Sequence, residues 1–236
     1  MKRSKKYLEA KKLVEEGKVY PVDAAVELLK SMPSVKFDQT VELSGELGID
    51  PKQSDQMVRG SVVLPHGTGK EIKVLVFCEP EKEKDAKTAG ADFIGSEDLI
   101  NKILNDGWTA FDCCISTPSM MRSVSKLGRF LGPRGLMPSP KTGTVTDNIS
   151  YAVGEAKRGK IDFRADKLGG IHVGVGKVSF DKKALVENIN AFIKALADSR
   201  PQSLKGDFIK SVHVSATMSP SLRIAVQAKF LGVSDD

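Results

Sequence analysis

Residues 37–49 alternate between apolar and polar side chains, a period of two that predicts a β-strand with one buried face. The positions of the buried parity are Phe37, Val41, Leu43, Leu47 and Ile49. A second strand is expected over residues 58–64. Before these strands, the spacing predicts a helix over 4–16 and another over 22–31, which is bracketed by two prolines.

Half-exposed strands return after residue 160, with one long amphipathic helix among them. The helix is expected over 181–198, where apolar residues recur at helical spacing and Asp181 is a suitable N-cap. The strands are expected over 160–165, 170–175, 208–216 and 221–228. The two ends of the chain therefore share one pattern.

The middle of the chain has a different pattern, in which apolar runs alternate with helical stretches. Residues 72–78 and 111–115 are apolar enough for strands that are covered on both faces, and a short strand is expected at 92–94. Helices are expected over 81–89, over 96–105 and after Pro118. This alternation predicts βαβ units around a parallel sheet.

The patterns together predict a fold that combines α+β and α/β classes in two domains. Residues 1–66 and 160–236 would form one discontinuous α+β domain, and residues 67–159 would form an α/β domain inserted into it. A length of 236 residues suits one large or two modest domains. The sequence shows no internal repeat and no low-complexity segment.

The composition excludes several classes of protein. With 40% hydrophobic and 28% charged residues, the chain is not disordered throughout. It lacks the ~18 consecutive apolar residues of a membrane-spanning helix, and no apolar stretch follows its basic N-terminus as in a secretory signal. We therefore expect no membrane partner. The neighbouring Cys113 and Cys114, with Cys78, favour a reducing compartment over a disulfide framework.

The net charge of +6 is mild, and its distribution is more informative than its size. Four of the six excess positive charges fall in residues 160–236. Residues 1–6 and 118–146 hold basic residues and no acid. Such runs are usually solvated faces, although basic runs in Gly/Pro-rich segments also suit a phosphate backbone.

No motif of a cofactor or catalytic site is complete. The segment Gly67–Lys70 lacks the first glycine and the final Ser or Thr of a phosphate-binding loop, and Gly174–Ser179 lacks the third glycine of a dinucleotide fingerprint. Both are interpreted as turns. The three histidines are far apart, and no spacing supplies a metal site. We expect no catalytic residues, no metal and no cofactor.

Two segments remain as candidates for binding. Residues 126–143 hold four glycines, three prolines and the exposed-type cations Lys126, Arg129, Arg134 and Lys141. This segment is either a structural loop that closes the inserted domain or a loop that follows a phosphate backbone. Residues 214–222 are rich in small hydroxyl side chains, which suit a hairpin turn and equally a contact with RNA 2′-hydroxyl groups.

The segment 126–138, KLGRFLGPRGLMP, resembles the signature of the large-subunit ribosomal protein L-one family, in its bacterial branch. The resemblance covers roughly residues 1–228 and leaves out the tail 229–236. Further matching segments are FDQTVE at 37–42, LGIDP at 47–51, VRG at 58–60, LPHGTGK at 64–70, AGAD at 89–92 and TM at 217–218.

The resemblance implies a split α+β domain from both termini and an inserted Rossmann-like α/β domain without a nucleotide. It also implies binding to large-subunit ribosomal RNA at the mobile stalk, help in releasing deacylated tRNA from the exit site, and repression of its own operon mRNA. The expected location is the cytoplasmic ribosome, with the chain present as a monomer. The alternative is a nucleotide-binding or catalytic protein that uses the central α/β domain.

Carried over by position, the resemblance implies an RNA-binding surface with Glu27 in a supporting role. Phe37 and Met218 would pack against ribose or base, Thr40 and Thr217 would make buried hydrogen bonds, and the cations would hold phosphates. The implied residues are Lys36, Phe37, Thr40, Arg164, Lys167, His172, Ser215, Thr217, Met218, Ser219, Pro220 and Ser221.

Ser219 departs from the family, which usually has glycine after Thr-Met. If that glycine serves a positive φ or a close approach of RNA, Ser219 weakens or redirects the contact; otherwise its hydroxyl adds a hydrogen bond. The sequence leaves these two alternatives open.

Overall fold

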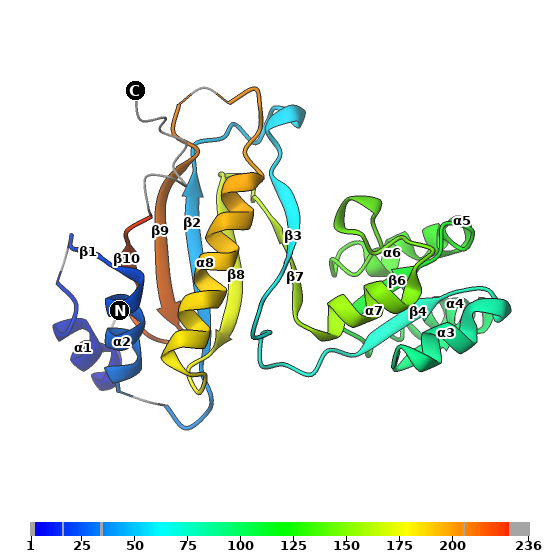
Figure 1. The fold of residues 1–236 in the computed structure, drawn as a ribbon, viewed down its shortest axis with the longest axis horizontal. Helices are drawn as coiled ribbons and strands as arrows, with labels where there is room; N and C mark the ends of the chain where they lie inside the picture. Colours follow the sequence, from blue (N-terminus) through cyan, green and yellow to red (C-terminus); the bar gives the residue numbers. More distant parts are fainter. Residues whose placement is uncertain (1–2, 16, 34, 205, 227–236) are drawn as a thin grey trace. The chain divides into compact units, whose positions relative to one another are not determined.

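The computed structural model describes residues 3–15, 17–33, 35–204 and 206–226 (Figure 1). Its contacts divide the chain into two compact units. One unit consists of the residues up to Gly69 together with those from Ile161 onward, and we call it the terminal unit. The other, Lys70–Lys160, is called the inserted unit.

The terminal unit is built on a five-stranded sheet of order β1-β10-β9-β2-β8. β1 pairs in parallel with β10, and the other neighbours are antiparallel. The sheet therefore joins segments from both ends of the chain. Its strands are β1 (Val19–Tyr20), β2 (Thr40–Leu47), β8 (Gly170–Lys177), β9 (Ile209–Ala216) and β10 (Leu222–Ile224).

Helices pack on one face of this sheet. α2 (Val22–Ser31) and α8 (Lys182–Asp198) contact each other and the strands beneath them, and α1 (Lys5–Lys12) precedes them in the chain (Figure 1). A separate pair, β3 (Arg59–Val63) with β7 (Lys160–Arg164), packs against α8. There Phe163 meets Phe192 edge to face, with ring centroids 5.5 Å apart.

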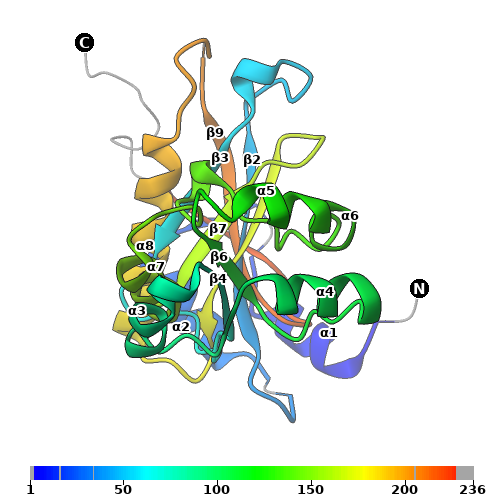
Figure 2. The ribbon, with the colours of Figure 1, turned by 90° about the vertical axis from the view of Figure 1, so that its right-hand side faces the viewer.

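The inserted unit contains a parallel sheet of order β5-β4-β6, so the parallel sheet predicted for the middle of the chain is confirmed. Val74 and Val76 of β4 belong to one apolar cluster, together with residues of α7, and Leu75 and Phe77 belong to a second cluster, together with residues of α4. In Figure 2, α7 and α4 lie on opposite sides of β4 and β6. The elements are β4 (Val74–Phe77), β5 (Phe93–Gly95), β6 (Cys113–Ser116), α3 (Glu83–Thr88), α4 (Glu97–Asp106), α5 (Met121–Val124), α6 (Gly128–Leu131) and α7 (Ile149–Lys157).

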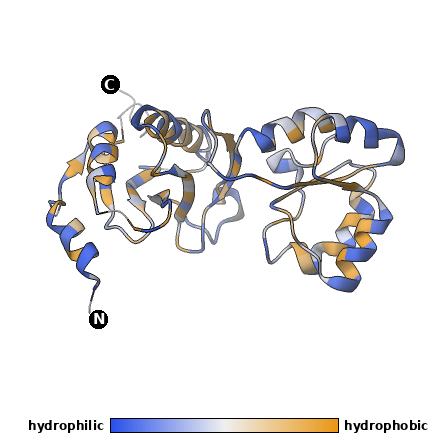
Figure 3. Cartoon of the chain, turned by 90° about the horizontal axis from the view of Figure 1, so that it is seen from below, coloured by the Kyte–Doolittle hydropathy of each residue, from blue (hydrophilic) through white to orange (hydrophobic). Residues whose placement is uncertain are grey.

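The fold is thus a mixture of helices and sheets, as expected, and hydrophobic residues lie along the strands and on parts of the helices (Figure 3). Single 3₁₀ turns complete it, at η1 (Ser54–Gln56), η2 (Pro80–Lys82), η3 (Ser125–Leu127) and η4 (Pro140–Thr142).

Several local predictions were wrong. The strand predicted from residue 37 begins at Thr40, so Phe37 lies outside it and is half exposed. The strand predicted over 111–115 begins at Cys113, because Phe111 packs against Trp108 before it. The prediction that Asp181 is the N-cap of α8 is confirmed by its position, although its side chain makes no capping hydrogen bond. The end of the strand expected over 221–228 lies outside the described residues.

The segment 126–143 is not one irregular loop, as the Gly/Pro content suggested. It starts with η3 and α6, because Leu127 and Leu131 stand four residues apart and bury themselves on the same side. It ends with η4. The irregular part lies between them, where Gly135 takes a positive φ of 71°.

Candidate nucleic-acid interface

The turn after β9 is tied to the first residue of β2. The backbone amide of Thr217 donates to the carbonyl oxygen of Thr40 (3.0 Å). The hydroxyl of Thr217 accepts from the Thr40 amide (3.2 Å) and donates to the Thr40 carbonyl oxygen (3.3 Å). These bonds join two segments separated by 177 residues, and they place both threonines at one end of the sheet.

Two further side chains hold this end in place. The ammonium of Lys177, at the end of β8, donates to the hydroxyl of Thr40 (2.8 Å). The carboxamide of Gln39 donates through Nε2 to the carbonyl oxygen of Thr217 (2.6 Å), and Gln39 is only 9% exposed. The predicted buried hydrogen bonds of Thr40 and Thr217 are therefore used within the protein, between half-buried partners.

Met218 has a strained backbone and an exposed side chain. Its φ is 68°, and it is the one non-glycine residue with positive φ in the described part of the chain. A left-handed conformation costs a residue with a Cβ about 1–2 kcal/mol. The side chain is 72% exposed, so its own burial does not offset that cost. Strain of this kind is typical of functional sites.

Ser219 closes the same turn with its hydroxyl. Its amide donates to the Ala216 carbonyl oxygen (2.8 Å), while its Oγ accepts from the Ala216 amide (2.9 Å) and donates to the Pro220 carbonyl oxygen (3.0 Å). Because the positive φ belongs to Met218, Ser219 needs no glycine-like backbone. Pro220 is buried beside it, and Ser221 is exposed.

Lys36 and Phe37 lie in the irregular segment that leads into β2. The side chain of Lys36 is exposed, and the ring of Phe37 is 50% exposed. The structure thus brings together nine of the residues singled out in the sequence, all at or near one end of the sheet. They are Lys36, Phe37, Thr40, Ser215, Thr217, Met218, Ser219, Pro220 and Ser221, and we call them the Thr217 end.

The sheet face opposite α2 and α8 carries a polar row that continues from the Thr217 end. Ser44 stands opposite His172 on one side and His213 on the other, and Arg223 stands opposite His213. Nδ1 of His172 lies 3.2 Å from the hydroxyl of Ser44. Burial, and then the positive charge of Arg223, lower the pKa of His213, against the opposite effect of Glu46.

The sequence interpretation included His172 and missed His213, Arg223 and Ser44. A signal for them was present, because Ser211, His213 and Ser215 occupy the polar parity of the strand expected over 208–216. What the sequence lacked was the register that aligns them with Ser44 and His172.

Arg164 and Lys167 lie toward the opposite end of the sheet. Thr40 pairs with Lys177 and Glu46 pairs with Gly170, so six residues of β2, about 20 Å, separate the two pairs. Lys167 lies in the turn just before Gly170. There the carboxylate of Asp166 accepts from the amides of Gly170 (2.7 Å) and Leu168 (2.8 Å), which lower its pKa.

Glu27 belongs to the helical layer instead of the open face. Its carboxylate accepts from Nζ of Lys182 at 2.7 Å, and this hydrogen bond lowers the pKa of Glu27. The pair joins α2 to the start of α8. The structure therefore gives Glu27 a contact between two helices, on the helical side of the sheet.

The four cations of the segment 126–143 are all exposed. Lys126 lies in η3, Arg129 in α6 and Lys141 in η4, whereas Arg134 lies in the turn between and donates to the hydroxyl of Thr109. These side chains are available to phosphates on the surface of this unit.

The segment Gly67–Lys70 forms a turn with a structural role. The fully buried Asn188 of α8 donates to the carbonyl oxygens of Gly67 (3.0 Å) and Val175 (2.8 Å) and accepts from the His66 amide (3.1 Å). Within the described ranges, no three His, Cys, Asp or Glu residues are grouped to hold a metal ion. No described helix is long and apolar enough to cross a membrane.

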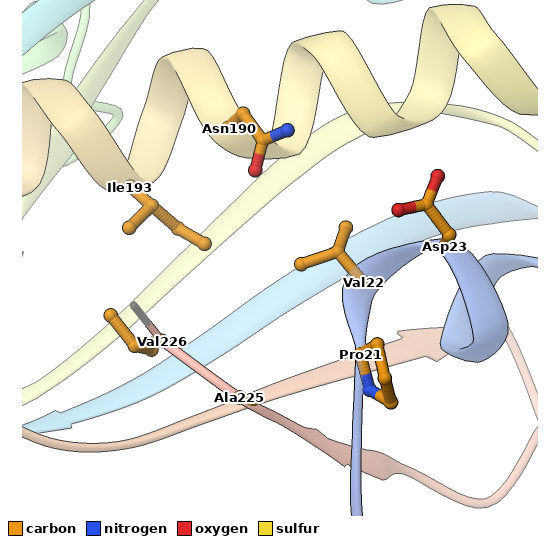
Figure 4. Close-up of a pocket in the computed structure, with 7 residues that line it drawn as sticks. All are labelled: Pro21, Val22, Asp23, Asn190, Ile193, Ala225 and Val226. Atoms are coloured by element: carbon orange, nitrogen blue, oxygen red, sulfur yellow. The ribbon is translucent and has the colours of Figure 1, made fainter. Parts of the chain in front are cut away.

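A cavity of about 190 Å³ lies between α2, α8 and the end of β10, away from the Thr217 end (Figure 4). Its walls are mainly apolar, from Pro21, Val22, Ile193 and Val226. Asp23 stands at its edge. A carboxylate repels phosphate groups, so this cavity does not suit a nucleic acid.

Comparison with known proteins gives one consistent result. The family model described as the ribosomal protein L1p/L10e family matches residues 28–220. The large ribosomal subunit protein uL1 of Persephonella marina is 57% identical over 228 residues, which cover 95% of this chain and 94% of that protein.

Proposed function

The chain belongs to the ribosomal protein L1p/L10e family, and from that premise we propose that it binds large-subunit ribosomal RNA, at the mobile stalk, through the Thr217 end of its five-stranded sheet. Membership in this family makes the chain a component of the cytoplasmic ribosome. The finer statements about its RNA contacts are the proposal.

The observation that carries the proposal is the strained turn at Met218. The chain holds an exposed apolar side chain in a left-handed conformation, and Thr40, Thr217 and Ser219 fix that turn by hydrogen bonds. An apolar side chain that projects from a fixed turn, at the same end of the sheet as the exposed Phe37, is suited to packing against ribose or an unstacked base.

Charge around the turn supports the same partner. Lys36 is exposed next to Phe37, and Arg223 lies on the adjoining open face. Cations so placed hold phosphates and contribute affinity that falls as salt rises. Arg164, Lys167 and His172 would contact the RNA farther along the sheet, about 20 Å from Thr40 for the turn before Gly170.

The same proposal includes two further RNA partners. The chain, as a monomer within the ribosome, would assist release of deacylated tRNA from the exit site, where the exposed cations of the inserted unit supply phosphate contacts. It would also repress translation of its own operon mRNA, because one surface at the Thr217 end can bind a similar folded element in both RNAs.

The test is to crosslink the purified protein to RNA in cell lysate and sequence the RNA that is recovered. We expect one segment of large-subunit ribosomal RNA to be the main product, with an mRNA segment of similar fold. Recovery of RNA without a preferred segment would contradict a specific site.

Binding to a transcript of the recovered segment then locates the surface. Thr217→Val should weaken binding by about 1–3 kcal/mol, because it removes the hydroxyl that fixes Thr40 and the turn. The matched control is Thr88→Val in α3 of the inserted unit, whose hydroxyl also bonds a backbone carbonyl oxygen. Equal losses from the two changes would rule out a specific role for Thr217.

A further inference from the structure

A cavity of about 290 Å³ opens beside the strained turn, between α1 and the segment that leads into β2. This volume is just below the usual range for ligand pockets, about 300–1,000 Å³, and is enough for one ring. Most of its wall is apolar, formed by Ala10, Met32, Pro33, Val35 and Met218. Such a wall suits the flat face of an aromatic ring, and the Met218 sulfur adds a polarizable contact.

One acceptor in the cavity wall has no hydrogen-bond partner among the described residues. Gln39 lines the cavity, and its Nε2 is used on the Thr217 carbonyl oxygen (2.6 Å), since only the amide nitrogen can donate to a carbonyl. Among the described residues, no group donates a hydrogen bond to its carboxamide oxygen. Every fully buried side-chain oxygen among them has a partner, so the Gln39 oxygen is not fully buried. The oxygen of Gln39 therefore remains open to a donor from outside.

The rim of the cavity is basic. Lys5 and Lys6 line it, and residues 3–8 hold three cations and no acid. The cavity between α2 and α8, in contrast, has Asp23 at its edge (Figure 4). The cavity beside Met218 thus combines an apolar wall, a hydrogen-bond acceptor and a cationic rim. These features match the ring, the donor edge and the phosphate of a nucleotide.

We propose that this cavity receives one nucleobase, unstacked from the bound RNA, with its ring on the apolar wall and an N–H of its edge donating to the Gln39 oxygen. Lys5 and Lys6 contact the adjacent phosphate. This inference rests on the proposed function, and it adds to that surface a subsite that recognises the edge of one base. The strained φ of Met218 gains a purpose, because it directs that side chain to the cavity.

The experiment fills the cavity and examines each nucleotide of the bound RNA. The probe is a transcript of the ribosomal RNA segment recovered by crosslinking, treated with reagents that modify the base-pairing edges. In the complex with the unaltered protein, one unpaired nucleotide should be protected. Val35→Phe, which fills the cavity, should expose that nucleotide again and weaken binding about tenfold, the value of one lost base contact.

Two companion variants make the result specific. Ala10→Phe fills the same cavity from α1, so a folding defect at one position cannot explain both results. Leu8→Phe adds an aromatic ring to the same helix at an exposed position outside the cavity, and it should behave as the unaltered protein. Thermal unfolding of each variant reports whether the terminal unit is intact.

The outcomes separate the two proposals. If the unaltered protein binds the transcript and folded Val35→Phe leaves the protection pattern unchanged, the base subsite is wrong while RNA binding stands. If the unaltered protein binds no transcript specifically, the proposed function fails, and the subsite fails with it. Loss of protection with Leu8→Phe as well would also overturn the subsite, since that change does not fill the cavity.

Discussion

The two sheets of the molecule differ in how many faces they bury. All four residues of β4 in the inserted unit are buried, because helices pack on both sides of the parallel sheet. In β2 of the terminal unit, Val41, Leu43 and Leu47 are buried while Glu42 and Glu46 are exposed. Within the described residues, the five-stranded sheet therefore leaves one face available to a partner, whereas β4 of the parallel sheet is covered on both faces.

This difference separates two ways of presenting side chains. An open antiparallel face holds side chains in a register set by backbone hydrogen bonds, as in the row of Arg223, His213, Ser44 and His172. In the inserted unit, exposed cations lie on short helices and turns. The positions of these side chains depend on the local turn geometry and not on a strand register. The first arrangement suits recognition of a folded RNA, and the second suits contacts with phosphates.

The largest effect on stability should come from truncating one buried phenylalanine in the hydrophobic core of each unit, one unit at a time. Phe192→Ala in the terminal unit and Phe77→Ala in the inserted unit remove rings that are at most 1% exposed, and each should cost about 3–5 kcal/mol of stability. Hydrogen exchange should lose protection mainly in the unit that carries the change. RNA binding should fall with Phe192→Ala alone, and an equal fall with Phe77→Ala would contradict a site confined to the terminal sheet.

A matched glycine substitution in each unit should have opposite effects on stability. At Gly48, after β2, a Cβ would overlap the Asp207 carbonyl oxygen, so Gly48→Ala should destabilise the terminal unit by about 1–3 kcal/mol. In α7 a Cβ at Gly154 meets nothing within 4 Å, so Gly154→Ala should stabilise the inserted unit by about 0.5–1 kcal/mol. Urea unfolding measures both, and the same sign for both would contradict these environments.

The next effect compares the two ends of the open sheet. Met218→Gly removes the exposed side chain and places at position 218 a residue that adopts positive φ readily. The free energy of unfolding should therefore change by less than about 1 kcal/mol. Its RNA affinity should fall about tenfold, the scale of one lost apolar contact with a base.

The control for Met218→Gly is Leu168→Gly in the turn between β7 and β8. Leu168 is 89% exposed and similar in size, and it lies at the other end of the sheet. Fluorescence titration with the recovered RNA segment should give an affinity within about twofold of the unaltered protein for this control. A larger loss of affinity from Leu168→Gly than from Met218→Gly would mean that the main RNA contact lies at the other end of the sheet, near Lys167.

Local periodicity was sufficient to predict most elements and one face of the sheet. The parity rule identified the buried residues Val41, Leu43 and Leu47 of β2, and the apolar run at 72–78 correctly indicated a strand covered on both faces. β1 was missed because two residues carry no period. α7 was missed although Ile149, Ala152, Val153 and Ala156 have helical spacing, because small alanines give a weak apolar signal.

The candidate site depends on features that a single sequence does not encode locally. The pairing of Thr40 with Thr217 spans 177 residues, and a strand register of that range has no local signature. From the sequence, a positive φ was considered only at position 219, because the family usually has glycine there. The structure has it one residue earlier, at Met218. The separation of Lys167 from Thr217 likewise follows from register, whereas the family resemblance only placed both residues on one surface.

The smallest expected effect is a pH dependence of the terminal sheet. Burial and Arg223 lower the pKa of His213 from 6.5 in the folded protein, whereas in the unfolded chain it is about 6.5. As the pH falls through 6.5, the unfolded chain therefore takes up this proton first, and stability decreases until the pH reaches the folded-state pKa.

Urea unfolding at pH 7.5 and 5.0 should show a smaller loss of stability for His213→Gln than for the unaltered protein. Arg223→Gln, which keeps His213 but removes one cause of its lowered pKa, should fall between them. An equal loss in all three proteins would mean that the pH dependence arises from groups other than His213.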